Sequence, residues 1–179
     1  IINKGDFMPI ISEATIKLLN KQLNEEHYSE NLYFNMAGWC SKQGLNGCAA
    51  FLNNHAAEEH THLEKFSDFI KKAGGQPIIS AMKEPEYDFK SVEEVFDKVV
   101  KHERYITALI KKLVDKSMDD KDYITLNFLD WFMNEQFEEE GLFNNIIDTI
   151  KILGDLKGRN LYTFDKFVAN LDQREHNKN

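Results

Sequence analysis

Apolar residues recur every three or four positions in four long segments of the chain, which is the spacing of amphipathic helices that bury one face. Ser12 can cap the first segment, and two glycines, Gly74 and Gly75, follow the second. Ser91 and Glu94 form a capping box before the third. The predicted helices cover about residues 12–41, 46–73, 91–118 and 123–153, and a shorter fifth helix covers about 160–171.

The connection between the second and third helices is unusually long. Residues 74–90 hold two of the three prolines, Pro77 and Pro85, and show no helical period. When extended, this segment spans up to about 56 Å, which exceeds the roughly 42 Å length of a 28-residue helix. The third helix can therefore run parallel to the second. We predict an all-α four-helix bundle with one long crossover between the second and third helices and a short fifth C-terminal helix.

The chain of 179 residues has the size of a single domain, which we expect to cover residues 1–179. We expect residues 1–11 to form an N-terminal extension and residues 172–179 a polar tail that frays. Met8, followed by Pro9, is a suitable natural start, so residues 1–7 are either foreign to the protein or the rest of a longer leader.

Charge and composition narrow the classes of partner. The formal net charge of −8 at pH 7 disfavours nucleic acid and anionic membranes and favours cations, although acidic balance also serves solubility. No stretch approaches the roughly twenty uninterrupted apolar residues that cross a bilayer. The two cysteines, Cys40 and Cys48, form no CxxC motif, which disfavours a disulfide framework or a structural zinc site. We expect both to be buried thiols of a cytoplasmic protein.

Polar residues interrupt the apolar stripe near the middle of each long helix. In the second helix the stripe passes from Leu52 through Glu59 and His62 to Phe66, so a carboxylate and an imidazole occupy core positions. A lone Glu-x-x-His pair usually lies on a solvated face, and an unpaired buried carboxylate is costly. The interrupting residues are Glu26 in the first helix, Glu59 and His62 in the second, Glu103 in the third, and Gln136 and Glu139 in the fourth.

The interrupting residues all lie near the midpoints of their helices, so they meet at one height whichever way the neighbours run. Four carboxylates in a dry core repel one another unless protons or metal ions compensate, and two divalent cations balance four carboxylates. Oxygen-rich ligation with one nitrogen suits iron or manganese, and zinc also binds such sites. Iron gives the geometry a purpose, because two Fe(II) ions supply the two electrons that reduce dioxygen to peroxide. We therefore predict a dinuclear site.

Tyr33 lies two turns after Glu26 on the same face of the first helix. Its hydroxyl can hydrogen-bond a metal ligand or its ring can donate an electron. An ordinary core tyrosine with a satisfied hydroxyl explains the position equally well.

The site residues and their neighbours resemble the ferritins, and the bacterial non-haem ferritins most closely. The resemblance covers essentially the whole chain, and its motifs are Asn24–Ser29 with Tyr33, His55–His62, Glu103, Asn127–Trp131 and Glu135–Glu140. It implies a ferritin-like bundle with an iron-oxidising ferroxidase centre. In that centre Glu26 and His62 hold one iron and Glu59 bridges. Glu103 and Glu139 hold the second iron, and Gln136 lies beside the position where oxygen binds.

The resemblance also implies a third iron site and an assembly. The positions that match the third-site ligands are Glu58, Glu135, Glu138 and Glu139, although a solvated acidic face explains the first three as well. The assembly is a homo-oligomeric shell of twenty-four subunits. It takes up Fe(II), oxidises it with dioxygen or hydrogen peroxide, and stores a ferric oxyhydroxide mineral.

Three features depart from related patterns. Bacterioferritins repeat Glu-x-x-His on the fourth helix, whereas this chain has Gln136-x-x-Glu139, so no haem is expected. His60 stands where bacterioferritins ligate haem with methionine; it can bind haem iron, but a partly exposed histidine near a subunit contact is the commoner case. Glu30 is either an extra ligand or a surface residue at an interface.

The acidic turn at residues 119–122 can attract Fe(II), but helix capping explains it more simply.

Two other functions fit parts of the pattern. A rubrerythrin-like di-iron peroxidase uses similar ligands, but that family carries a CxxC-based iron domain that this chain lacks. A storage or structural shell with little catalysis needs no ferroxidase ligands, and their full set speaks against it.

Overall fold

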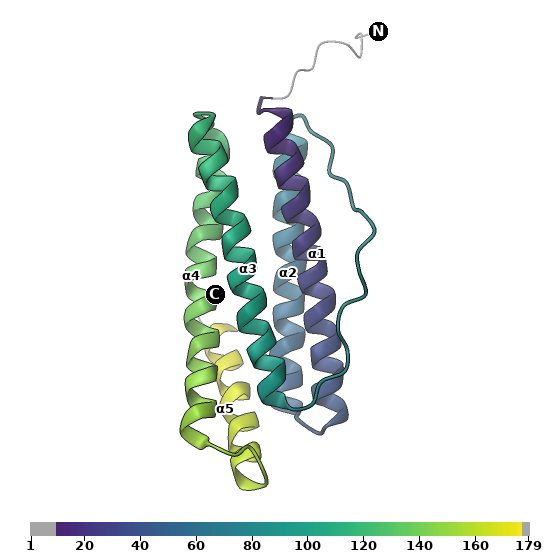
Figure 1. The fold of residues 1–179 in the computed structure, drawn as a ribbon, viewed down its shortest axis with the longest axis vertical. Helices are drawn as coiled ribbons and strands as arrows, with labels where there is room; N and C mark the ends of the chain where they lie inside the picture. The colour runs from purple at the N-terminus through teal and green to yellow at the C-terminus, as the bar shows by residue number, and fades with distance from the viewer. Residues whose placement is uncertain (1–9, 177–179) are drawn as a thin grey trace.

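The computed structural model describes residues 10–176, and within that range the chain is helical with no strand. Its helices are α1 (Glu13–Lys42), α2 (Asn46–Lys72), α3 (Val92–Asp119), α4 (Tyr123–Leu153) and α5 (Arg159–His176). The four long helices lie side by side, and α5 packs at one end of the bundle (Figure 1). The predicted all-α class is confirmed, and the four long helices have nearly the predicted bounds. None of the helices in the described range has the length and hydropathy needed to span a bilayer.

The structure differs most from the prediction at the C-terminal end of the chain, while most of the N-terminal end is not described. Residues 1–9, which make up most of the predicted N-terminal extension, lie outside the described residues. At the other end α5 extends past the predicted end at Leu171 as far as His176. The added segment contains neither glycine nor proline, so nothing in its backbone chemistry ends the helix at Leu171.

The crossover between α2 and α3 runs along the length of the bundle beside α1, so α2 and α3 are parallel, as predicted (Figure 1). Two asparagines one turn apart on α1 hold it in place. The Asn20 amide accepts a hydrogen bond from Ile78 N (2.7 Å) and donates one to Gln76 O (3.0 Å). The Asn24 amide accepts from Ser80 N (2.7 Å) and donates to Ile78 O (2.8 Å). The two side chains thus pair with the crossover backbone as a neighbouring strand would.

Side-chain oxygens cap three of the long helices at their N-termini. Ser12 accepts from Thr15 N (3.1 Å), and Ser91 accepts from Glu94 N (3.3 Å). In the acidic turn, Asp122 caps α4 by accepting from Thr125 N (3.0 Å). Capping therefore accounts for Asp122, as the simpler of the two explanations expected.

The N-terminus of α2 is capped from another helix. Its N-cap residue, Leu45, offers no side-chain hydrogen bond. The Asp165 carboxylate on α5 accepts instead from Gly47 N (3.1 Å) and Cys48 N (2.8 Å). A β-carbon at Gly47 would lie 2.2 Å from the Asp165 carbonyl oxygen, so this close approach requires glycine. Both cysteines are free and buried, as expected.

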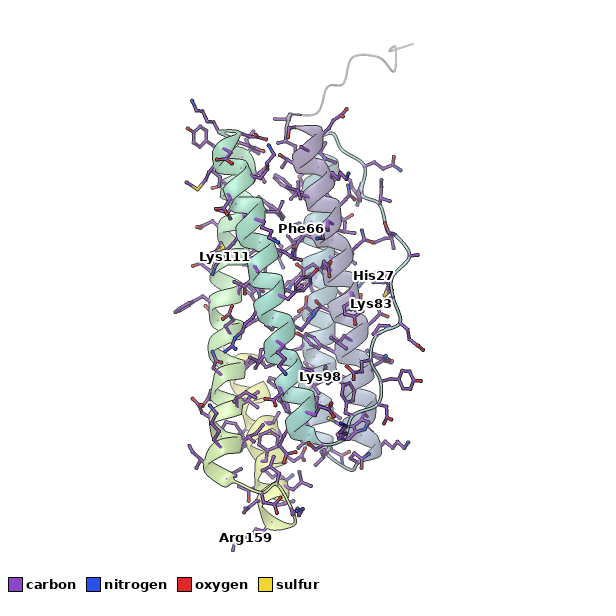
Figure 2. The ribbon with its side chains drawn as sticks, in the orientation of Figure 1. His27, Phe66, Lys83, Lys98, Lys111 and Arg159 are labelled. Carbon is purple, nitrogen blue, oxygen red and sulfur yellow. The ribbon has the colours of Figure 1, made fainter. Side chains whose placement is uncertain are left out.

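The hydrophobic core is divided into two clusters along the bundle axis. One cluster contains Phe51, Phe96 and Phe164 near α5, and the other contains Phe66 and Phe132 towards the opposite end. Figure 2 shows Phe66 inside the bundle. The polar residues predicted for the site lie on the same helices between the two clusters.

We predict that Asn24→Ala will speed amide hydrogen exchange at Ser80 by about fivefold, because the net value of one hydrogen bond is roughly 1 kcal/mol. Asn31→Ala is the matched control, since the Asn31 amide donates to His27 O within α1. Equal exchange at Ser80 in the two variants would show that Asn24 does not hold the crossover.

Candidate metal centre

Six polar side chains from the four long helices meet in the middle of the bundle, each no more than 6% exposed. They are Glu26 on α1, Glu59 and His62 on α2, Glu103 on α3, and Gln136 and Glu139 on α4. The structure thus brings together every residue predicted for the dinuclear site. The helical stripes that bury Leu23, Phe66 and Ile106 carry these polar groups into the core.

The carboxylates and the imidazole form two overlapping groups. One atom each of Glu26, Glu59 and His62 lie within 4.8 Å of one another, and the same holds for Glu59, Glu103 and Glu139. Such separations suit three ligand atoms around one cation. Because Glu59 belongs to both groups, it is the residue that two neighbouring cations would share.

Two carboxylate oxygens in these groups accept no hydrogen bond from any described residue. They are Glu59 Oε2 and Glu139 Oε2, and both are buried. A buried polar atom without a partner is costly and rare in folded proteins. Cations bound between these carboxylates would supply the missing partner.

The carboxyl groups hold their protons far more tightly than exposed glutamates. Burial raises the pKa of Glu26 to about 7, although hydrogen bonds with Glu59 and Gln22 oppose the rise. Burial, followed by repulsion from Glu26, raises the pKa of Glu59 well above its usual value. Burial and then the charge of Glu103 do the same for Glu139. Without a cation, bound protons therefore offset part of the negative charge of the cluster near neutral pH.

His62 is the one nitrogen ligand in these groups, and its environment keeps it neutral. Burial, followed by the positive charge of Lys65, lowers the pKa of His62 to about 3. Its ring packs edge-on against Trp131 at 5.4 Å and Phe132 at 5.9 Å between centroids. Its Nδ1 lies 3.4 Å from Glu59 Oε2. A neutral, sterically fixed imidazole is the form that binds metals.

Gln136 and Tyr33 both hydrogen-bond to Glu103. Gln136 Nε2 donates to Glu103 Oε2 (3.0 Å) and to Thr107 Oγ1 (3.2 Å). The Tyr33 hydroxyl donates to Glu103 Oε1, and the side chain is fully buried. Of the alternatives for Tyr33, the hydrogen bond to a predicted ligand is present in the structure.

Sequence reasoning missed two residues that support the ligands. Gln22, 1% exposed, donates to Glu26 Oε1 (2.8 Å). Thr107 accepts from Gln136 and donates to Glu140 Oε1 (2.6 Å). Each lies four residues from a ligand on the same helix face, so a search one turn before and after each ligand would have found both.

The residues predicted for a third iron lie at the edge of this centre. Glu135 is half-buried and groups with His62 and Glu139, one atom of each lying within 4.8 Å of the others. Among the described residues no three-ligand group includes Glu58, which is half-buried, or Glu138, which is exposed. The third site therefore stays a prediction.

Glu30 and His60 face each other on the surface between α1 and α2. His60 Nδ1 lies 3.2 Å from Glu30 Oε1, and its Nε2 lies 3.7 Å from Glu64 Oε1. Neither Glu30 nor His60 belongs to a three-ligand group in the described range.

The chain is similar to known proteins over most of its length. The family model for the ferritin-like domain matches residues 16–153. A probable bacterial non-heme ferritin-like protein of Haemophilus influenzae is 43% identical, with 92% of this chain and 99% of the relative covered. A bacterial non-heme ferritin of Campylobacter jejuni is 41% identical, covering 90% of this chain and 96% of the relative.

A solved structure has the same architecture. An open pore ferritin from Archaeoglobus fulgidus superposes with a TM-score of 0.85 at 35% identity, covering 89% of this chain and 98% of that one. Together with the family match and the two relatives, this likeness leads to one conclusion. The chain belongs to the ferritin family.

Proposed function

We propose that this protein stores iron as a subunit of a homo-oligomeric shell and oxidises Fe(II) at the centre between its four long helices. The main observation that supports this proposal is the pair of buried three-ligand groups that share Glu59. Such a set of carboxylates and one neutral imidazole suits iron. The names of the relatives, bacterial non-heme ferritins, support the same function.

Each ligand has a distinct role in this proposal. Glu26 and His62 bind one Fe(II), and Glu103 and Glu139 bind the other. Glu59 bridges the two ions. Each ion gives up one electron, so two Fe(II) become two Fe(III) while one dioxygen and two protons become hydrogen peroxide. Hydrogen peroxide itself can replace dioxygen as the oxidant and is then reduced to water.

The surrounding hydrogen bonds position the ligands for this reaction. Gln136 and Tyr33 each donate to one oxygen of Glu103, which orients that carboxylate and delocalises its charge. Gln22 does the same for Glu26. In this proposal Tyr33 also donates an electron to the oxidised centre, and its hydrogen bond to Glu103 supports that role.

The oxidised iron then moves to storage. Glu58, Glu135, Glu138 and Glu139 hold a third iron on its way to the interior. There Fe(III) hydrolyses to a ferric oxyhydroxide mineral inside a shell of twenty-four subunits in the cytoplasm. No haem takes part.

We predict that Glu59→Ala will slow Fe(II) oxidation at least tenfold in stopped-flow absorbance measurements, because both ions lose a shared ligand. Glu64→Ala removes an exposed carboxylate from the same helix and serves as the matched control. If Glu59→Ala oxidises Fe(II) as fast as the unmodified protein, the proposed centre is wrong.

We also predict that Fe(II) binding without oxygen will strengthen as the pH rises from 6 to 8. The pKa of Glu26 is about 7, so this group carries a proton at pH 6 that the ions must displace. Burial also raises the pKa values of Glu59 and Glu139, which adds to the competition between protons and ions. His62, with a pKa of about 3, is already deprotonated and does not compete. Each displaced proton makes the affinity rise by up to about tenfold per pH unit.

Calorimetry in two buffers with different ionisation enthalpies counts the released protons. At least one proton per chain is expected at pH 6. Binding that is independent of pH and releases none would contradict the idea that cations replace protons in the cluster.

A further inference from the structure

A groove of about 950 Å³ lies on the side of the bundle formed by α1, the crossover and α3. Its volume is within the range of sites for small organic ligands. Its apolar lining includes Leu32, Met36, Ile78 and Met82. Tyr28, His102 and Tyr105 add a wall of rings. The groove is separate from the iron ligands, none of which lines it.

The groove is electropositive although the protein carries a net charge of −8. Lys17 and Lys21 on α1 and Lys101 on α3 line it, and none has an acidic partner among the described residues. The two acids that line it are already engaged. Glu86 pairs with Lys98 at 2.5 Å, and Glu25 accepts from the Tyr105 hydroxyl at 2.8 Å.

Two further lysines border the groove. Lys83 Nζ lies 4.7 Å from the centre of the Tyr28 ring. Figure 2 shows Lys83 beside α1 and Lys98 at the lower part of α3, with Lys111 higher on that helix. Lys98 is paired with Glu86, but Lys83 and the unpaired Lys17, Lys21 and Lys101 add positive charge around the aromatic wall and complement a planar anion.

The ring wall also leads to the metal centre. The His102 ring lies 5.7 Å from the Tyr28 ring and 6.2 Å from the Tyr105 ring, centroid to centroid. On its inner side the His102 ring meets the Tyr33 ring edge-on at 6.0 Å. Tyr33 in turn hydrogen-bonds Glu103, a proposed iron ligand. Ser29 Oγ fixes His102 at 2.7 Å from its Nε2. The ring contacts of His102 with Tyr28 and Tyr33 therefore connect the groove to the hydrogen bond between Tyr33 and Glu103.

We propose that the groove binds a planar aromatic phosphate that carries electrons, represented by reduced flavin mononucleotide, and that its electrons reach ferric iron at the centre across His102 and Tyr33. Lys17, Lys21 and Lys101 bind the phosphate, and the ring system packs on Tyr28 and Tyr105. The binding step is independent of the proposed function. The choice of ferric iron at the centre as the electron acceptor rests on the proposed function.

The redox step is balanced without a further reagent. One dihydroflavin loses two electrons and two protons and leaves as oxidised flavin. Two Fe(III) each gain one electron and become Fe(II), which is soluble and can leave the protein. His102 and Tyr33 bridge the transfer and are unchanged at its end. The groove thus provides for the reduction of stored Fe(III), a step that the ferroxidase reaction does not perform.

Fluorescence titration of the intact, iron-free protein with flavin mononucleotide tests the binding step. Quenching that saturates at one flavin per chain is expected. Riboflavin, which lacks the phosphate, should bind at least tenfold more weakly. The double variant Lys17→Glu, Lys21→Glu should weaken binding of the phosphate form at least tenfold and leave riboflavin nearly unaffected.

The matched control is Lys111→Glu, Lys112→Glu, which makes the same charge change at exposed positions of α3 outside the groove. It should bind flavin mononucleotide like the unmodified protein. If both double variants bind flavin mononucleotide equally weakly, overall charge explains the loss of affinity and the proposed site is wrong. Absence of binding, as when a second copy of the chain covers the groove, would overturn it as well.

Iron release tests the electron step. Iron-loaded protein is mixed without oxygen with dihydroflavin mononucleotide, and Fe(II) is trapped by a coloured chelator. The rate of Fe(II) release should saturate at dihydroflavin concentrations near the dissociation constant measured in the titration. The redox-inert aromatic phosphate 1-naphthyl phosphate should inhibit the release. A rate that rises linearly and ignores Lys17→Glu, Lys21→Glu would refute the route.

Failure of this proposal and failure of the ferroxidase proposal look different. Glu59→Ala should leave flavin binding to iron-free protein unchanged, because Glu59 does not line the groove. If the unmodified protein binds flavin but does not oxidise Fe(II), the ferroxidase proposal alone fails. If it oxidises Fe(II) but binds no flavin, the groove proposal alone fails.

Discussion

The cost of burying four carboxylates together is the constraint on which this bundle depends. Glu26, Glu59, Glu103 and Glu139 are each no more than 6% exposed, and burial raises the proton affinity of three of them. Charged carboxylates at this depth would push the helices apart. Protons relieve the repulsion in the empty centre, and divalent cations do so when they displace those protons. The same repulsion therefore explains why these carboxyl groups hold protons tightly and why the proposed cations would take the place of those protons.

The rest of the fold serves to keep these groups at one height. Apolar clusters above and below the centre exclude water and fix the register of the four helices. The crossover, held by Asn20 and Asn24, allows α3 to run parallel to α2. Glu103 on α3 then reaches the same level of the core as the polar residues on the other three long helices. Asp165 on α5 completes the N-terminus of α2, the helix that carries Glu59 and His62. Contacts distant from the proposed metal centre thus determine where its polar side chains meet.

Periodicity predicts what repeats along one helix and is silent on pairings between distant segments. The helices and the meeting of the buried polar residues could be predicted because Glu59 and Glu103 interrupt otherwise apolar stripes. Asn24 could not be assigned to the crossover, since its partner lies more than fifty residues away and makes backbone hydrogen bonds without a side-chain pattern. The same holds for Asp165 and the N-terminus of α2. The groove joins three segments that no sequence motif connects, which is why it emerged only from the structure.

Crystals soaked anaerobically in Fe(II), with anomalous scattering collected at the iron edge, test the central claim most directly, because this measurement counts the ions and names their ligands together. Two iron positions per subunit are expected, one among Glu26, Glu59 and His62 and the other among Glu59, Glu103 and Glu139. Glu59 should contact both ions. Ordered iron found only elsewhere, or a centre that stays empty at saturating Fe(II), would contradict the view that cations replace protons in this core.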